Sequence, residues 1–205
     1  MIDNKKLISI LEAIQVKIHE NAQFLTELDA AIGDSDHGIN LDRGFSKVIE
    51  TKDSLSELDC GAILKKVGMT LVSTVGGASG PLYGTAFMKA GGALAGKNEL
   101  NFEDFLLALK EAIGGVKMRG KGEKGEKTML DAMIPALEIM EENKTLEPKQ
   151  ALELGVKAAQ EGVEYTKTII ATKGRASYLG ERSLGHQDPG ATSFTYLLQA
   201  IQESL

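Results

Sequence analysis

Apolar residues recur along this chain with the spacing of amphipathic helices. The first stripe follows i, i+3, i+4, i+7 spacing after a potential N-cap at Asp3 and consists of Leu7, Ile10, Leu11, Ile14 and Ile18. Further stripes predict a second helix over residues 24–28 that stops near Gly33, and others at 41–49, 63–71, 105–116, 133–140, 148–170 and 191–201. No segment alternates apolar and polar residues between turn signals, so strands are not expected. The pattern predicts an all-α fold of eight or nine helices, in a single domain spanning residues 1–205.

The 23 glycines are not spread evenly along this helical pattern. They gather in five segments, at 33–38, 76–84, 91–96, 114–125 and 174–190. Glycine lets the backbone approach a ligand closely, although helix ends and tight turns explain several of these positions. Gly91-Gly92 and Gly114-Gly115 are assigned to packing or turns. The remaining clusters predict loops gathered at one end of the helices, around a small anionic ligand.

Composition and charge narrow the classes of function. The chain carries 23 Lys and Arg against 29 Asp and Glu, a net charge of −6, and no Trp, which excludes an electrostatic or stacking surface for nucleic acid. No apolar run approaches a membrane span, and the N-terminal MIDNKKLISI lacks the basic start of a signal peptide. The single cysteine, Cys60, fits a reducing compartment, so we expect a cytoplasmic protein. An acidic protein that binds phosphates must use metal ions or backbone N–H groups.

Three carboxylates lie within eight residues in the stretch LDAAIGDSDHG. Asp34 and Asp36 occupy a glycine-bracketed loop between two predicted helices, and Asp29 lies near the end of the first helix. Like charges this close repel unless a cation or proton compensates them, and carboxylate oxygens suit Mg²⁺. The spacing predicts a magnesium site of Asp29, Asp34 and Asp36, which together can bridge two ions. The alternative is structural, with Asp34 and Asp36 as turn and N-cap residues.

Two other metal sites are excluded by the residues present. An EF-hand that begins at Asp34 needs glycine at loop position 6 and glutamate at position 12, where this chain has Ile39 and Phe45. A zinc site would need more nitrogen or sulfur ligands than three histidines and one cysteine supply. His37 is therefore expected to be a solvated or phosphate-facing loop residue.

Three more loops are candidates for phosphate contacts. Segment 76–84, GGASGPLYG, places Ser79 and Pro81 at the expected start of a helix, where free N–H groups bind anions; an ordinary helix–helix turn is the alternative. Segment 120–128 lacks the context of a dinucleotide fingerprint and the spacing of a Walker A loop. Two interpretations of this segment stay open: a flexible cationic loop that approaches phosphates, or a run of charged residues that only contacts solvent. Segment 174–190 is long, polar and nearly structureless, and its Arg175 and Arg182 predict a lid over the ligand.

Four blocks, in order along essentially the whole chain, resemble the nucleotide-binding L subunits of dihydroxyacetone kinases. They are LDAAIGDSDHG, GGASGPLYG, GEKTMLDA and GRASYLGERSLGHQDPGA. Ser35 stands where the family often has glycine or another small residue, a departure that leaves every carboxylate in place. The resemblance implies an eight-helix up-and-down antiparallel barrel with a site for ADP or ATP and two Mg²⁺ ions at one end.

The resemblance also assigns roles by motif. Asp29, Asp34 and Asp36 would hold the magnesium ions. The implied nucleotide-contacting residues are His37, Gly38, Ile39, Asn40, Ala78, Ser79, Gly120, Met129, Arg175, Asp188, Pro189 and Gly190. Among them, Ala78 and Ser79 would contact phosphates, Gly120 and Met129 would border the adenine, and the last four would complete the lid.

The resemblance further implies a phosphotransferase that acts on dihydroxyacetone bound to a separate K subunit and is incomplete without it. A free-standing L subunit is similar to the phosphotransferase-system form, in which a phosphocarrier M subunit rephosphorylates ADP in place. An ATP-exchanging L subunit of another short-ketose kinase would carry the same motifs, and so would a non-catalytic, nucleotide-loaded regulatory module. A purely structural helical protein is the third class, and it predicts no magnesium-dependent nucleotide binding.

Overall fold

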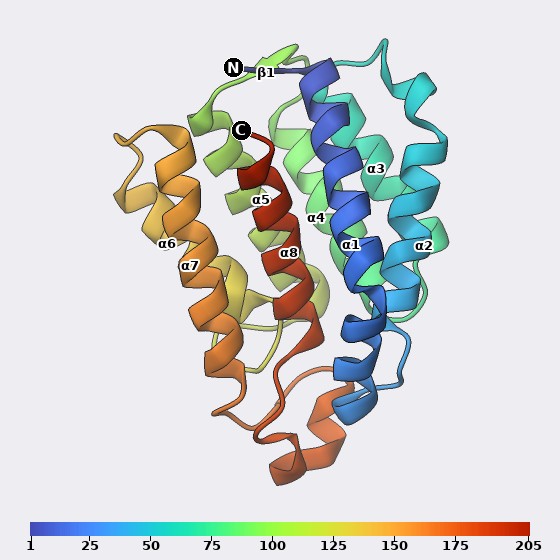
Figure 1. Ribbon diagram of the computed structural model, residues 1–205, viewed down its shortest axis with the longest axis vertical. Helices are drawn as coiled ribbons and strands as arrows, with labels where there is room; N and C mark the ends of the chain where they lie inside the picture. The colour runs from blue at the N-terminus through green and yellow to red at the C-terminus, as the bar shows by residue number, and fades with distance from the viewer.

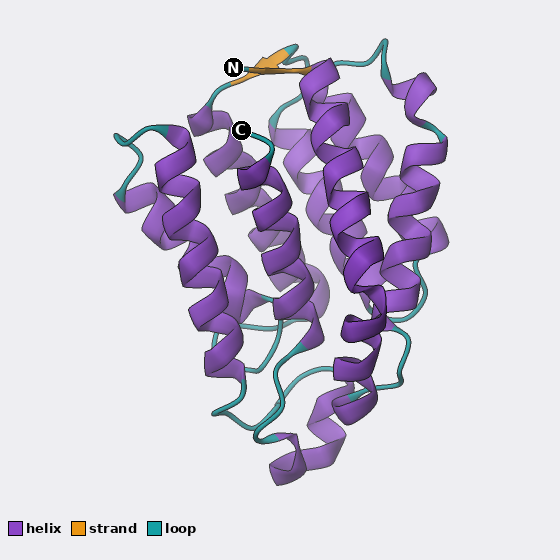
Figure 2. Ribbon diagram, in the orientation of Figure 1, coloured by secondary structure: helices purple, strands orange, loops and turns teal.

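Eight α-helices run up and down beside one another in the computed structural model, which describes all 205 residues (Figure 1, Figure 2). They are α1 (Asn4–Ile32), α2 (His37–Glu50), α3 (Cys60–Thr74), α4 (Ser79–Ala93), α5 (Phe102–Gly120), α6 (Leu130–Glu142), α7 (Pro148–Thr166) and α8 (Pro189–Glu203). Two 3₁₀-helices, η1 (Lys52–Leu55) and η2 (Arg175–Ser183), lie between them. The all-α prediction is confirmed. The expectation of no strands was wrong only for a two-residue ladder, in which β1 (Ile2–Asp3) pairs antiparallel with β2 (Glu99–Leu100).

The helices close into a barrel. Each helix packs against the next one in the sequence, and α8 packs against α1 to complete the ring. Both chain termini lie at one end of the barrel, and the loops after α1, α3, α5 and α7 meet at the other end (Figure 1). Segments that are far apart in the sequence therefore converge at this loop end, as the glycine clusters predicted.

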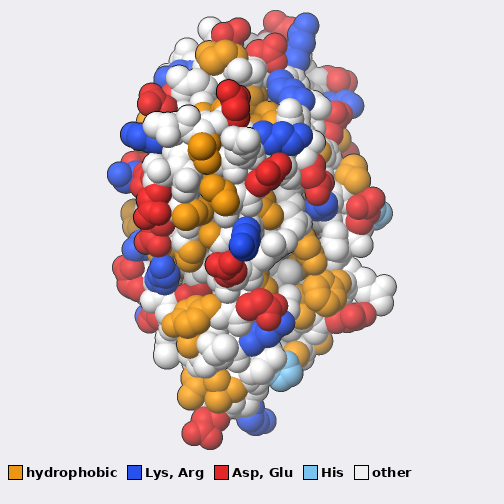
Figure 3. Space-filling model, turned by 60° about the vertical axis from the view of Figure 1, so that its left-hand side comes forward, with side chains coloured by type: hydrophobic (Ala, Val, Ile, Leu, Met, Phe, Trp, Pro, Cys, Tyr) orange, Lys and Arg blue, Asp and Glu red, His pale blue; other side chains and the backbone are white.

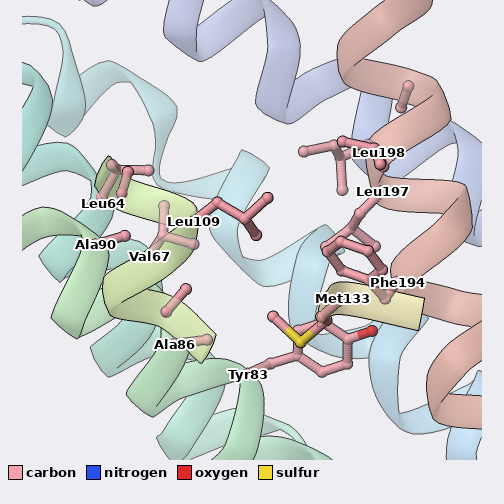
Figure 4. Close-up of a cluster of buried hydrophobic side chains, with 14 of the residues drawn as sticks. Leu64, Val67, Tyr83, Ala86, Ala90, Leu109, Met133, Phe194, Leu197 and Leu198 are labelled. Atoms are coloured by element: carbon pink, nitrogen blue, oxygen red, sulfur yellow. The ribbon is translucent and has the colours of Figure 1, made fainter. Parts of the chain in front are cut away.

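Apolar side chains from all eight helices fill most of the barrel interior. A cavity of about 150 Å³ remains inside it, and every residue that lines this cavity is apolar or aromatic. Tyr83, Met133 and Phe194 lie together in this interior (Figure 4). The interior therefore offers almost no hydrogen-bond partner for the hydroxyl of Tyr83.

The first two predicted helices are one continuous helix, α1, of 29 residues. The sequence between the two apolar stripes contains neither proline nor glycine, so nothing breaks the backbone hydrogen bonding there. The polar residues in and after this stretch bond back to the helix itself: the Asn21 side chain donates to the Lys17 carbonyl at 2.8 Å, and Thr26 donates to the Ala22 carbonyl at 2.8 Å. The weak apolar signal marks a solvent-facing turn rather than a break.

Charged side chains of both signs are interspersed over the face shown in Figure 3. This face presents no broad basic surface, in agreement with the net charge of −6. No helix is both long enough and apolar enough to cross a membrane.

Candidate functional site

The acidic corner is built where α1 ends and α2 begins. Asp29 lies in the last turn of α1, and its Oδ2 accepts the backbone N–H groups of Asp36 at 2.9 Å and His37 at 3.1 Å. Gly33 follows α1, and a Cβ at this position would lie 1.9 Å from Oδ1 of Asp29. Only glycine therefore leaves room for the Asp29 carboxylate against the loop. The buried carboxylate in turn holds the loop that presents the other two aspartates.

Oxygens of Asp29, Asp34 and Asp36 lie within 4.8 Å of one another. Ser35 adopts φ 64, in the left-handed region that favours glycine, and this turn places the aspartates on either side of it close together. Burial raises the pKa of Asp36, and the neighbouring charge of Asp34 raises it further. A cluster of three carboxylates is stabilised by a cation, and this all-oxygen donor set fits Mg²⁺. The residues present are therefore compatible with the implied metal.

Asp34 is the only one of the three with a cationic partner. Nη2 of Arg175, at the start of η2, lies 2.8 Å from Oδ2 of Asp34. This ion pair connects the segment predicted to be a lid to the acidic corner. Asp29 and Asp36 form no ion pair with Lys or Arg, so much of the negative charge stays uncompensated by the protein.

A cavity of about 480 Å³ opens beside the three carboxylates. It lies at the loop end of the barrel, between the C-terminal ends of α1 and α5 and the N-terminal ends of α2, α4, α6 and α8, with the start of η2 over it (Figure 1). The predicted site residues that line it are Asp29, Asp34, Asp36, His37, Ala78, Ser79, Gly120, Met129, Arg175, Asp188, Pro189 and Gly190. The tertiary structure thus brings together residues from all four sequence blocks.

Three predicted site residues do not line the cavity. Gly38 packs against α1, where a Cβ would lie 1.9 Å from the carbonyl oxygen of Ala22. Ile39 is 57% exposed and faces away, with its N–H donating to Thr26 Oγ1 at 3.2 Å. Asn40 is buried, and its Oδ1 accepts from Arg43 Nη2 at 2.7 Å. The first turn of α2 therefore supports the acidic corner from behind, and only His37 reaches the cavity wall.

Sequence reasoning missed an apolar part of the cavity wall. It is formed by Ile32, Leu82, Val116 and Leu130, next to Met129. Two missed cations, Arg119 and Lys173, also line the cavity. Of these apolar residues only Val116 belongs to a predicted stripe. The feature that the four share is their position in terminal helical turns at the loop end. A wall of this kind suits the flat face of a ligand ring.

Neither alternative for segment 120–128, a flexible cationic loop or a solvated charge run, holds for its last lysine, Lys127. Lys127 is only 1% exposed and donates from Nζ to the carbonyl oxygens of Thr166, Ile169 and His186. The loop itself is held by Asp131, which accepts the backbone N–H groups of Gly125 and Thr128. Lys127 thus fastens three segments of the chain together and is not available as a solvated charge.

The segment after α7 is also more ordered than its sequence indicates. Residues 175–183 form η2, with a kink at Gly180, where φ is 55. Ser183 is buried, donates to the Gly180 carbonyl at 2.7 Å and accepts the Ala171 N–H at 3.0 Å. The prediction of a nearly structureless loop was wrong because these local bonds replace the regular ones. Arg175, at the start of this segment, lines the cavity, and the lid itself stays a prediction.

Asp188 is the N-cap of α8. Its side chain accepts the Ala191 N–H at 2.7 Å. Burial raises the pKa of Asp188 to about 7, although the bond from Ala191 favours the charged form. Lys127 lowers this pKa, whereas Asp131 and Asp29 raise it.

Replacing Asp188 by asparagine is expected to remove a stability penalty that grows with pH. The unfolded carboxyl ionises near 3.8 and the folded one near 7, so folding takes up a proton between these values. The folded protein therefore loses stability at this residue as the pH rises from about 4 to about 7. Asparagine keeps a good N-cap without the charge. Urea unfolding of both proteins at pH 5 and pH 8 measures the effect. At pH 8 the unfolding free energy of the variant should increase relative to that of the wild type.

The comparison must be made between the two proteins at each pH, because other groups titrate in the same range. Burial lowers the pKa of His37 to about 4, which acts on stability in the opposite direction. A difference in unfolding free energy that is the same at both pH values would contradict the prediction.

A model of the DAK2 domain matches residues 31–203, a range that holds every residue of the cavity wall except Asp29. The chain belongs to the DAK2-domain family. The match begins two residues after Asp29 and covers α2 to α8.

Two relatives with high identity are named as kinase subunits. The chain is 47% identical over 182 residues, 88% of its length, to the PEP-dependent dihydroxyacetone kinase ADP-binding subunit DhaL of Escherichia coli (strain K12), of which it covers 87%. It is 43% identical over 199 residues, 96% of its length, to the corresponding subunit of kinase 2 of Listeria innocua, of which it covers 92%.

A solved structure shares the barrel. The dihydroxyacetone kinase of C. freundii in complex with AMP-PNP and Mg²⁺ superposes with a TM-score of 0.74 at 25% identity. The superposition covers 97% of this chain but only 34% of the kinase chain, so the barrel is about one third of that longer protein.

Proposed function

We propose that this chain is the ADP-binding L subunit of a dihydroxyacetone kinase, a phosphotransferase that needs a separate sugar-binding K subunit. Its cavity would hold ADP or ATP with two Mg²⁺ ions, and a phosphocarrier M subunit would rephosphorylate the ADP in place. The names of the E. coli and L. innocua relatives support the nucleotide and the PEP-dependent mode, and the C. freundii complex supports Mg²⁺. We place this activity in the cytoplasm.

One observation carries the proposal: a single cavity combines a triad of carboxylates with an apolar wall. The oxygens of Asp29, Asp34 and Asp36 lie within 4.8 Å of one another at one side of a cavity of about 480 Å³. The apolar residues and Met129 lie elsewhere on the same wall. An acidic cluster alone would suit many cations. An acidic cluster beside an apolar slot fits a ligand with a phosphate end and a flat ring.

The residues of this chain would act by positioning and by charge. Bound Mg²⁺ would offset the negative charge of the phosphates and of the aspartates. α4 begins at the cavity with Ser79, and the first N–H groups of a helix have no intrahelical partner, so they can bind phosphate oxygens. Arg175 would exchange part of its contact with Asp34 for the phosphates, since a guanidinium suits both. In phosphoryl transfer little covalent chemistry falls to the protein, so such positioning accounts for the role we propose.

The proposed need for a K subunit is supported by the size of the relative of known structure. The barrel is 34% of the C. freundii kinase chain, so that enzyme carries additional domains beside it. We infer that the hydroxyl acceptor is presented to the cavity by a partner chain here.

The mass of the ligand released on denaturation tests this function. Protein purified in magnesium buffer is expected to release stoichiometric ADP, and to transfer phosphoryl groups when K and M subunits are added. Protein that is empty but binds ATP when Mg²⁺ is added would instead support an ATP-exchanging L subunit. Bound ADP without any transfer to the K subunit would support a regulatory module. Binding of neither nucleotide would overturn the proposal.

A further inference from the structure

The segment predicted to be a lid is closed at its base by contacts between its two ends. In this lid loop, residues 167–187, the Gly185 N–H donates to the Lys167 carbonyl at 2.8 Å. The Asp188 N–H donates to Thr166 Oγ1 at 2.9 Å. The chain therefore leaves the barrel at the end of α7 and returns to the same place before α8. Loops whose ends lie this close together are compact and frequently functional.

Lys127 reaches the base of the lid loop from a different loop of the barrel. Its ammonium group has three hydrogens to donate, and it donates to the carbonyl oxygens of Thr166, Ile169 and His186. The first two carbonyls stand where the lid loop leaves α7, and the third stands just before it joins α8. One buried side chain therefore binds both ends of the lid loop at once.

The backbone of Lys127 adopts a conformation that is unfavourable for a residue with a side chain. Its φ is 62, in the left-handed region, and such a conformation persists only where the surrounding structure enforces it. Buried Asp131 enforces it here by accepting the backbone N–H groups of Gly125 and Thr128. Thr128 and Met129, the next two residues, line the cavity. The contact with the lid loop therefore belongs to the same turn that forms part of the cavity wall.

The tip of the lid loop is held more weakly than its base. Arg175 pairs with Asp34 at 2.8 Å, and the arginine side chain is 65% exposed. An exposed ion pair of this kind contributes little to stability. Ala176 and Leu179 pack near Ile32 in a small apolar cluster that is separate from the barrel core. The tip can therefore move while buried hydrogen bonds keep the base in place.

We propose that Lys127 is a positioning residue that fixes the base of the lid loop and thereby sets the rate at which a bound nucleotide leaves the cavity. With both ends locked, the loop holds Arg175 at the cavity. Without the lysine both ends are released together, and Arg175 spends less time there. The identity of the nucleotide as ADP rests on the proposed function. A coenzyme that is rephosphorylated in place must stay bound between turnovers, and a locked lid slows its release.

Hydrogen exchange of the nucleotide-free protein tests the fixed base. The amides of Gly185 and Asp188 are expected to have protection factors at least tenfold higher than those of the tip, residues 175–182. In Lys127→Met this difference should disappear. Leu55→Ala is the matched control, because Leu55 is buried in η1 at the opposite end of the barrel and its truncation also lowers stability. It should keep the difference. Base amides that are no better protected than the tip in the wild type, or that stay protected in Lys127→Met, would overturn the proposal.

Release of a fluorescent ADP analogue in the presence of Mg²⁺ tests the effect on the cavity. After mixing with excess unlabelled ADP, Lys127→Met is expected to release the analogue at least tenfold faster than the wild type, and Leu55→Ala at the wild-type rate. Lys127→Gln keeps one amide donor for the three carbonyls, so its rate should lie between those of Lys127→Met and the wild type. In an Arg175→Ala background Lys127→Met should have little further effect, because its effect passes through Arg175.

The outcomes separate this inference from the proposed function. Equal acceleration of release in Lys127→Met and Leu55→Ala would show a general loss of stability and would overturn the role of Lys127. An undiminished effect of Lys127→Met in the Arg175→Ala background would also overturn it. A wild-type protein that binds no ADP would instead count against the proposed function, and hydrogen exchange would still decide whether Lys127 fixes the base of the lid loop.

Discussion

Asp36→Asn is expected to weaken the binding of ADP in the presence of Mg²⁺ by about a hundredfold or more, equivalent to roughly 3 kcal/mol. Asp36 has no Lys or Arg partner, and burial and the charge of Asp34 raise its pKa. Its carboxylate is thus poised for a cation that the protein does not provide. Asparagine keeps the size of the side chain and removes the charge, and it remains a poorer ligand for Mg²⁺. Isothermal titration with ADP, with and without Mg²⁺, measures the effect.

The control for this variant is Asp53→Asn. Asp53 is exposed in η1, at the end of the barrel opposite the cavity, so the same substitution should leave ADP affinity unchanged. Asp34→Ala should act in the same direction as Asp36→Asn, although it also frees Arg175. The Asp36→Asn protein should unfold at the same or higher urea concentration than the wild type, because repulsion among the carboxylates is relieved. Wild-type affinity in this variant, with Mg²⁺ present, would contradict the magnesium assignment.

Lys127→Met is expected to have the largest effect on stability, a loss of about 3 kcal/mol in the free energy of unfolding. The ammonium group of Lys127 donates to three carbonyl oxygens, of Thr166, Ile169 and His186, and methionine offers them no donor. These carbonyls belong to the end of α7 and to the segments on either side of η2, so their release should loosen the lid. For a chain of this length the melting temperature should fall by roughly 6–12 °C.

Lys121→Met provides a matched control in the same loop. Lys121 also has a positive φ, 50 against 62 for Lys127, but its side chain is exposed. Its replacement should change the unfolding free energy by less than about 0.5 kcal/mol. Equal effects of the two substitutions on urea or thermal unfolding would show that the buried contacts of Lys127 do not stabilise the fold.

The sequence predicted the features that depend on neighbours along the chain. The helical stripes, the N-cap at Asp3 and the glycine-bracketed aspartates all follow from spacings of a few residues, and they correspond to observed elements. Local spacing misled where a solvent-facing turn resembled a helix break within α1, and where the turns of η2 lack a regular apolar period. The chemistry of the acidic corner was predictable because three carboxylates within eight residues need compensation wherever they lie.

The tertiary structure alone decided which polar groups are buried and what they contact. Lys127 looked like one more cation in a charged loop, yet its partners lie 39 to 59 residues further along the chain. Ser193 and Tyr83 looked like ordinary helix residues, and they join His37 and Ser79 across separations of 42 to 156 residues. No periodicity encodes such pairs, because they depend on how the barrel closes and on which side chains its loop end excludes from water.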